Sequence, residues 1–236
     1  MNRLSWAIAP AVVAVLLFSA GPLDAGRKEK ETEVVRNAVE VLEDISAIPE
    51  TGIPPTLLQN AYGIAVVPGV IKVGFVVGGR HGRGVVLVRD DRGGWSNPVF
   101  ISLTGGSVGW QIGAQSTDVI LVFKSGKSID GIMKGKFTVG ADAAVAAGPV
   151  GRSASASTDA QLKAEIYSYS RSRGLFAGVS VEGAALQIDE DANAAFYGKE
   201  GVRAGEILKG EGIPSPPPAV RLKDFLAKHA GAKAGE

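Results

Sequence analysis

Four short segments of the 236-residue chain have the residue types and spacing of known chemical sites. Gly105-Gly106-Ser107-Val108-Gly109 fits the G-x-S-x-G pattern of serine hydrolases, in which the serine stands on a sharp turn between a strand and a helix. The residues after Ser107 are strand-like, and the histidine that follows in the chain, His229, lies far away in the tail. The segment therefore favours a glycine-rich turn, and a serine hydrolase at Ser107 is a remote alternative.

Two further matches are incomplete. Gly126-Lys127-Ser128 resembles the end of a phosphate-binding loop, but Leu121 stands where that loop needs its first glycine. Residues 189–200 have the acidic spacing of a calcium loop, but Ala194 replaces the glycine of the sixth position. We expect one of the first two aspartates of this segment to cap a helix instead.

The fourth segment, Gly79-Arg80-His81-Gly82-Arg83-Gly84, combines glycine backbone with two arginines, a composition that can bind an anion. The flanking runs Val70–Val77 and Val85–Val88 predict that it is a hairpin turn, and an anion site there stays open. With two histidines and no cysteine, a histidine-rich transition-metal site cannot be assembled. We therefore expect that the protein binds no metal or other cofactor and that it is not an enzyme.

Charge is nearly balanced along the whole chain but not within it. The 25 basic and 24 acidic residues give a net charge of +1, which does not predict nucleic-acid binding. Lys72–Arg92 has five basic and two acidic residues, Lys124–Lys136 has four and one, and Glu182–Glu200 has one and five. If the two basic stretches meet in the fold, they form a cationic surface, whereas scattered surface charge is the alternative. The candidate lipid-binding residues are Lys72, Arg80, Arg83, Lys124, Lys127, Lys134 and Lys136.

The elements that position these residues are predicted to be mainly strands. Glycine makes up 32 residues, about twice its ordinary share, and each glycine inside a helix costs about 1 kcal/mol. Short β-branched or aromatic runs separated by glycines predict an α+β fold. It is predominantly an antiparallel sheet, closed like a barrel or sandwiched, with an N-terminal amphipathic helix and short C-terminal helices. The expected strands of the first half are Ile64–Val67, Val70–Val77, Val85–Val88, Val99–Leu103 and Val119–Phe123.

Helices and a later hairpin complete the predicted domain, residues 26–212. An apolar stripe predicts a helix over residues 26–48, which Pro49 ends. Its members are Val34, Ala38, Val41, Leu42, Ile45 and Ile48. Shorter helices are expected at Thr56–Ala61, Asp189–Tyr197 and Val202–Leu208, and a hairpin is expected from Glu165–Arg171 and Leu175–Ile188.

Both ends of the chain carry segments outside that domain. Arg3 precedes an apolar run, Leu4–Phe18, and small residues follow, which is typical of a secretory signal over residues 1–25; a retained anchor is the alternative. We therefore expect a periplasmic or secreted protein, with peripheral membrane association possible in principle. Residues 213–236 contain a proline-rich spacer and an amphipathic helix, which must pack on its own domain or on a partner.

The segment Tyr167–Gly183 (YSYSRSRGLFAGVSVEG) resembles the signature of the SYLF domain. The similarity runs in order from about Val34 to Leu208. Its other blocks are Asn60–Pro68, Gly78–Val85, Gly93–Pro98, Gly148–Gly151 and Asn193–Gly198.

The resemblance implies a lipid-binding module rather than an enzyme. Eukaryotic members of the family bind phosphoinositides, and yeast relatives also bind actin. For an exported bacterial member we expect anionic phospholipid of the cell envelope as the partner, bound through basic loops, with no nucleic acid and no actin. The alternative is an envelope protein that binds a protein or glycan through the proline spacer and tail helix. Residues 27–44 have four basic and six acidic side chains, so the N-terminal helix is expected to cover the sheet rather than enter a membrane.

Overall fold

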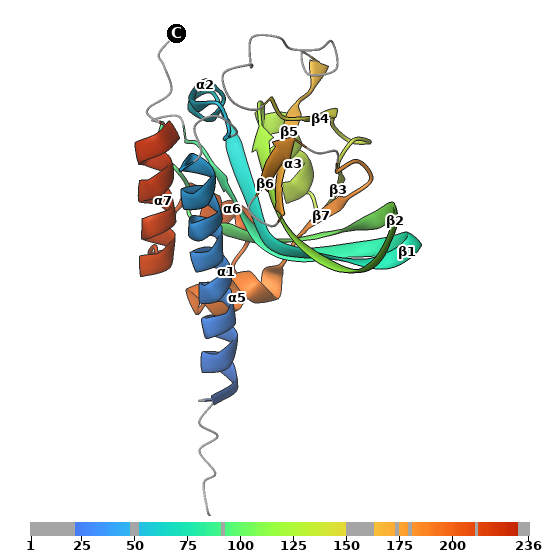
Figure 1. The fold of residues 1–236 in the computed structure, drawn as a ribbon. Coiled ribbons are helices and arrows are strands. Elements are labelled where there is room, and N and C mark those ends of the chain that lie inside the picture. Colours follow the sequence, from blue (N-terminus) through green and yellow to red (C-terminus); the bar gives the residue numbers. More distant parts are fainter. Residues whose placement is uncertain are drawn as a thin grey trace, which may run out of the picture.

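The computed structural model describes residues 22–47, 52–90, 93–149, 163–172, 175–178, 181–210 and 212–230. In Figure 1 the helices α1 and α7 lie side by side, and a curled sheet extends away from them. The predicted α+β fold class is confirmed. The elements in chain order are α1 (Pro22–Ser46), α2 (Pro55–Gln59), β1 (Gly63–Val88), β2 (Val99–Phe123), α3 (Gly126–Met133), β3 (Lys136–Thr138), β4 (Val145–Ala147), β5 (Ile166–Ser172), β6 (Leu175–Gly178), β7 (Ala185–Ile188), α5 (Glu190–Tyr197), α6 (Ala204–Lys209) and α7 (Pro217–Ala230).

The sheet is organised around β2. One edge of β2 pairs with β1 from end to end, and the other edge pairs with β7 near its start and with β5 near its end. Strand β3 adds to β7, and β4 and β6 add to β5. These pairings are antiparallel, as predicted, apart from the parallel pair β4–β5. The short helices α2, α5 and α6 are also confirmed. The predicted hairpin is confirmed for β5 with β6, but its second strand, predicted as Leu175–Ile188, is divided into β6 and β7, and β7 pairs with β2 and β3 instead.

The predicted division of the first half into five short strands is wrong. β1 has 26 residues and β2 has 25, and the two pair as one long curled ribbon. The segment Gly79–Gly84, predicted to be a hairpin turn, is strand and pairs in continuous register with Ile101–Gly106. Its glycines serve a different purpose: the curl brings Gly82 close to Val67 and Val70 of the same strand, where a Cβ atom would lie 2.8 Å from each side chain.

The predicted turn at Pro68-Gly69 is a bulge within β1. Proline has no N–H to give to the ladder, and the register shifts between Val67 and Val70. Gly69 has φ +59°, and its N–H donates to the Asp118 carboxylate at 2.9 Å. The connection between β1 and β2, in contrast, lies where predicted, with Gly93 at φ +81°.

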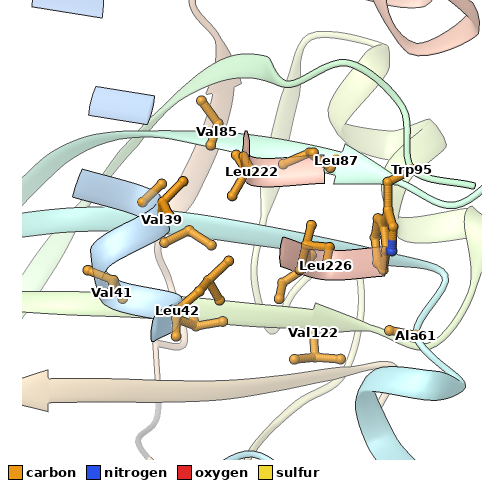
Figure 2. Packing of buried hydrophobic residues seen from close by; sticks show 14 of the residues in the cluster. Val39, Val41, Leu42, Ala61, Val85, Leu87, Trp95, Val122, Leu222 and Leu226 are labelled. Atoms are coloured by element: carbon orange, nitrogen blue, oxygen red, sulfur yellow. The ribbon is translucent and has the colours of Figure 1, made fainter. Parts of the chain in front are cut away.

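Apolar side chains pack on both faces of the sheet. On one face the helices α1 and α7 place Leu42, Leu222 and Leu226 against Val85 and Leu87 of β1 (Figure 2). The predicted stripe of the N-terminal helix is confirmed as its packing face, apart from Ile48, which lies outside the described residues. Helices α3 and α6 cover the other face. Each fully buried aliphatic side chain stabilises the fold by about 1.5–3 kcal/mol.

The tail helix α7 docks on its own domain. Leu222 and Leu226 are buried, and the guanidinium of Arg89, at the end of β1, donates to the carbonyl oxygen of Ala230 at 3.3 Å. The same guanidinium donates to the Leu58 carbonyl oxygen at 3.2 Å. The alternative function uses the tail helix to bind a partner. The apolar side chains Leu222 and Leu226 of that helix instead pack against its own domain.

The predicted signal peptide lies outside the described residues, except for Pro22–Ala25, which begin α1. Within the described ranges no helix is both long and apolar enough to cross a membrane. Export stays a prediction.

Candidate functional site

The outer part of the long ribbon carries two of the predicted lipid-binding residues. We call residues 71–81 of β1 and their partners, residues 104–116 of β2, the ribbon arm. It contains Lys72 and Arg80 and no Asp or Glu. The side chains of Ile71 and Val73 are 51% and 59% exposed, which is unusual for β-branched residues in a sheet. The arm therefore combines positive charge with exposed aliphatic surface.

Lys72 and Arg80 lie close enough to influence each other. Burial, and then the positive charge of Arg80, lower the pKa of the Lys72 ammonium. Burial also lowers the pKa of the Arg80 guanidinium, which donates to the Glu182 carbonyl oxygen at 3.0 Å. The Arg80 Nε atom is buried and has no hydrogen-bond partner among the described residues. An anion beside the two cations would relieve their repulsion.

Arg83 is held by two carboxylates. Its guanidinium lies 2.9 Å from Glu31 of α1 and 3.0 Å from Asp189, and Glu31 is buried. Burial lowers the pKa of Arg83, but the hydrogen bonds and charges of the two carboxylates outweigh this and raise it overall. Arg83 therefore fastens α1 and the start of α5 to the sheet, and we leave it out of the proposed lipid surface.

A second arginine fastens the other end of α1. The Arg171 guanidinium of β5 pairs with Asp44 of α1 and lies 2.9 Å from Asp118 of β2. A third pair joins Arg221 of α7 to Glu43 at 2.9 Å. Three acidic residues of α1, Glu31, Glu43 and Asp44, thus pair with arginines of neighbouring elements, in line with the prediction that this helix covers the sheet.

The other predicted cations lie around α3 and β3. The Lys124 ammonium lies 5.3 Å from the ring centre of Tyr167, a cation–π distance, and Lys127 lies 3.7 Å from Glu165. Lys134 ends α3 and is exposed. Lys136 begins β3 opposite Gln187, and its side chain lies outside the described part of the structure. These four residues are near one another in sequence but are anchored on different elements from the arm.

An open groove of about 1240 Å³ lies beside Lys134. It runs between the end of α3, strand β7 and the starts of α5 and α6. Its lining carries both signs of charge, with Arg203 and Lys209 beside the acidic Asp191 and Glu206. Hydrogen bonds from Arg203 and Lys199 lower the pKa of Glu206. A lining of this kind favours neither an acyl chain nor an anion.

The remaining chemical matches are structural. Ser107 lies inside β2, so the strand–turn–helix of a hydrolase elbow is not formed there. Asp189 is the N-cap of α5, as predicted, and accepts the Ala192 N–H at 3.0 Å. The supposed calcium loop is that helix. Gly126 and Ser128 belong to the first turn of α3. Within the described ranges no three His, Cys, Asp or Glu residues gather in a way that would hold a metal ion.

Two features of the site were missed in the sequence. Glu31 lies four residues before the buried Val35, on the packing face of α1, and this helical spacing was the available signal for a buried carboxylate. Ile71 and Val73 were predicted to lie in a strand, but their exposure was not predicted. The alternation of side chains along a strand does not indicate which part of a strand the helices leave uncovered.

Comparison with known proteins identifies related sequences. A family model described as "Las17-binding protein actin regulator" (Ysc84) matches residues 104–229. The SH3 domain-containing YSC84-like protein 1 of Xenopus laevis is 38% identical over 197 residues, which are 81% of this chain and 58% of the relative. Protein YSC84 of Saccharomyces cerevisiae is 36% identical over 205 residues, 86% of this chain and 43% of the relative. The LAS seventeen-binding protein 3 of the same yeast is 40% identical over 171 residues, 71% and 36% of the two chains.

These names correct one expectation. The sequence-based prediction excluded actin as a partner, yet the matched family is described as an actin regulator and a relative is named for binding LAS seventeen. The exclusion is wrong. The chain spans about half, or less, of the length of these relatives. Their printed names describe SH3-domain and binding proteins rather than enzymes.

Proposed function

This chain belongs to the Ysc84 family of SYLF-domain proteins, and from that premise we propose that it is a binding module that attaches to anionic phospholipid surfaces through the ribbon arm. The observation that carries the proposal is the charge of the arm. Lys72 and Arg80 lie together on a pair of strand segments that contains no acidic residue.

The electrostatics of the other cations support the arm as the primary contact. Arg83 and Lys127 each have a carboxylate within 4 Å. The pKa of the Lys72 ammonium is instead lowered by burial and then by repulsion from Arg80. A basic residue near an anionic membrane contributes about 1 kcal/mol. Two such residues give weak, reversible adhesion, and the exposed Lys134 strengthens it if the membrane reaches that far.

The proposal is tested by sedimentation of the purified protein with phosphatidylcholine vesicles that contain phosphatidylglycerol, cardiolipin or phosphatidylserine. We expect binding at about 0.1 M salt that weakens strongly at about 1 M salt, where the Debye length falls from about 10 Å to about 3 Å. Pure phosphatidylcholine vesicles are the control. If no anionic vesicle binds the protein at low salt, the proposal is wrong.

A second candidate function follows from the relatives. We propose that the module also binds a protein of actin-regulating machinery, because the family is described as an actin regulator and a relative is named for binding LAS seventeen. The test is co-sedimentation of the purified chain with actin filaments, with and without a purified LAS seventeen-type protein. Sedimentation of the chain with either component supports this candidate, and its absence with both contradicts it.

A further inference from the structure

We propose that the ribbon arm does more than adhere to charge: it dips into the interface of an anionic bilayer, where Ile71 and Val73 contact acyl chains while Lys72 and Arg80 stay at the headgroups. The inference rests on the proposed lipid attachment and names the surface and the mode by which it occurs. It differs from adhesion through basic loops because part of the binding energy is hydrophobic and insensitive to salt.

The first observation is where the aliphatic side chains lie. Val70 is fully buried, whereas Ile71 and Val73 are more than half exposed. Successive side chains of a strand alternate between faces, so these two share one face and Lys72 lies on the other. The arm is amphipathic across its thickness, with aliphatic side chains on one face and positive charge on the opposite one.

The second observation is that the arm is thin. Residues 105–116 of β2 pair with β1, and within the described residues no third strand adds to them. Neighbouring strands lie about 4.8 Å apart. Around Lys72, a two-stranded ribbon that enters the headgroup layer can therefore contact lipid with both faces, whereas the Arg80 end of the arm also contacts Glu182, whose carbonyl oxygen accepts a hydrogen bond from Arg80. Lysine and arginine stems can then extend along apolar surface while their charged ends reach phosphate groups.

Charge complementarity selects the bilayer over a second copy of the chain. Two arms packed through the faces of Ile71 and Val73 would cover the aliphatic side chains but leave Lys72 and Arg80 of both copies on the outer faces, with no arm carboxylate to neutralise them. An anionic lipid surface offers many phosphates and an apolar layer within a few ångströms of each other. The phosphates match the cationic face of the arm, and the apolar layer matches its aliphatic face.

The absence of cysteine from the chain gives a clean experiment. Val73→Cys and the matched control Val220→Cys, an exposed valine on α7, are each labelled with an environment-sensitive fluorophore. The vesicles are phosphatidylcholine with phosphatidylglycerol, with and without brominated acyl chains. We expect a blue shift and bromine quenching for the label at residue 73 and neither for the label at residue 220. A second variant, Ile71→Ser with Val73→Ser, should bind about tenfold more weakly at high salt than Val220→Ser.

The outcomes separate the two proposals. Salt-sensitive binding with no change in the label at residue 73, and no effect of the serine pair, overturns insertion and leaves lipid attachment standing. No binding of the unmodified protein to any anionic vesicle overturns both. A shift at residue 73 that grows with protein concentration without vesicles identifies contact between copies and overturns insertion. An equal shift on adding polyglutamate identifies an acidic protein surface as the occupant and also overturns it.

Discussion

Gly84 lies directly against Val66 of the same strand: a Cβ atom on Gly84 would stand 2.1 Å from the Val66 carbonyl oxygen. The contact exists because β1 curls until its two halves meet. At the ends of the strand the Tyr62 carbonyl oxygen accepts the Arg89 N–H at 2.8 Å. The curled ribbon carries the arm, with Lys72 and Arg80, outward from α1 and α7 (Figure 1). Glycines such as Gly84 thus permit the curl of β1 that positions the proposed site.

Replacement of Gly84 by alanine tests this connection. The obstructing atom is backbone and cannot rotate away, so we expect the free energy of unfolding to fall by about 3 kcal/mol. Gly106→Ala is the matched control, since nothing lies within 4 Å of its added Cβ. Urea unfolding of both variants makes the comparison, and equal stability of the two would contradict the curled packing.

The pair of Arg83 with the buried Glu31 gives a second prediction. Arg83→Ala leaves a carboxylate buried without its main partner, and we expect a loss of about 2–3 kcal/mol, less than for a fully buried pair because the Arg83 side chain is 36% exposed. Arg36→Ala, which removes an exposed arginine from ion pairs with Glu29 and Glu33, should change stability by less than about 1 kcal/mol. Thermal unfolding of the two variants decides the question. If Arg83→Ala is as stable as the control, the ion pairs of Arg83 with Glu31 and Asp189 do not stabilise the fold.

Docking of the tail helix gives a third prediction. Leu222 is fully buried, so Leu222→Ala should destabilise the whole domain by about 2–5 kcal/mol in a single transition. Val220→Ala on the exposed side of α7 should cost little. A Leu222→Ala protein that melts like the unmodified chain would mean that α7 is free to engage a partner.

Alkaline pH provides a fourth test. Burial raises the pKa of the Tyr197 hydroxyl well above its ordinary value near 10, and that hydroxyl donates to the Pro98 carbonyl oxygen at 2.6 Å. Above about pH 10 the unfolded chain loses this proton while the folded chain keeps it. Stability from Tyr197 is therefore complete below pH 10 and falls as pH rises toward the folded-state pKa.

Tyr197→Phe should remove that dependence. The slope of unfolding free energy against pH above pH 10 should become shallower by up to about 1.4 kcal/mol per pH unit, while stability at neutral pH falls by about 1 kcal/mol. Urea titrations at several alkaline pH values measure the slope. An unchanged slope would show that Tyr197 ionises equally in both states.

Local patterns in the sequence predicted the helices well and the sheet only in part. The stripe of α1, the cap at Asp189 and the hairpin of β5 with β6 are set by residues near one another in the chain, so periodicity and capping rules reach them. Gly82 and Gly84 gave the opposite result. Glycine next to charge usually marks a turn, but here its role is set by Val66, Val67 and Val70, a dozen or more residues earlier.

The candidate site shows the same limit. The local excess of basic residues identified Lys72, Arg80 and Arg83 as one group of candidate lipid-binding residues. The fold shows that Arg83 is instead paired with Glu31 and Asp189, which lie 52 residues before it and 106 residues after it and could not be paired with it from the sequence. The exposure of Ile71 and Val73 likewise depends on where α1 and α7 end against the sheet. Contacts between distant segments decide which cations remain available.

The most direct test of lipid attachment through the ribbon arm compares two double variants with the same loss of charge. Lys72→Gln with Arg80→Gln removes the arm cations, and Arg221→Gln with Lys228→Gln removes two cations from α7. Binding to phosphatidylglycerol-containing vesicles at about 0.1 M salt is measured for both. We expect at least about tenfold weaker binding for the arm variant and near-normal binding for the α7 variant. Equal binding by the two variants would contradict attachment through the ribbon arm.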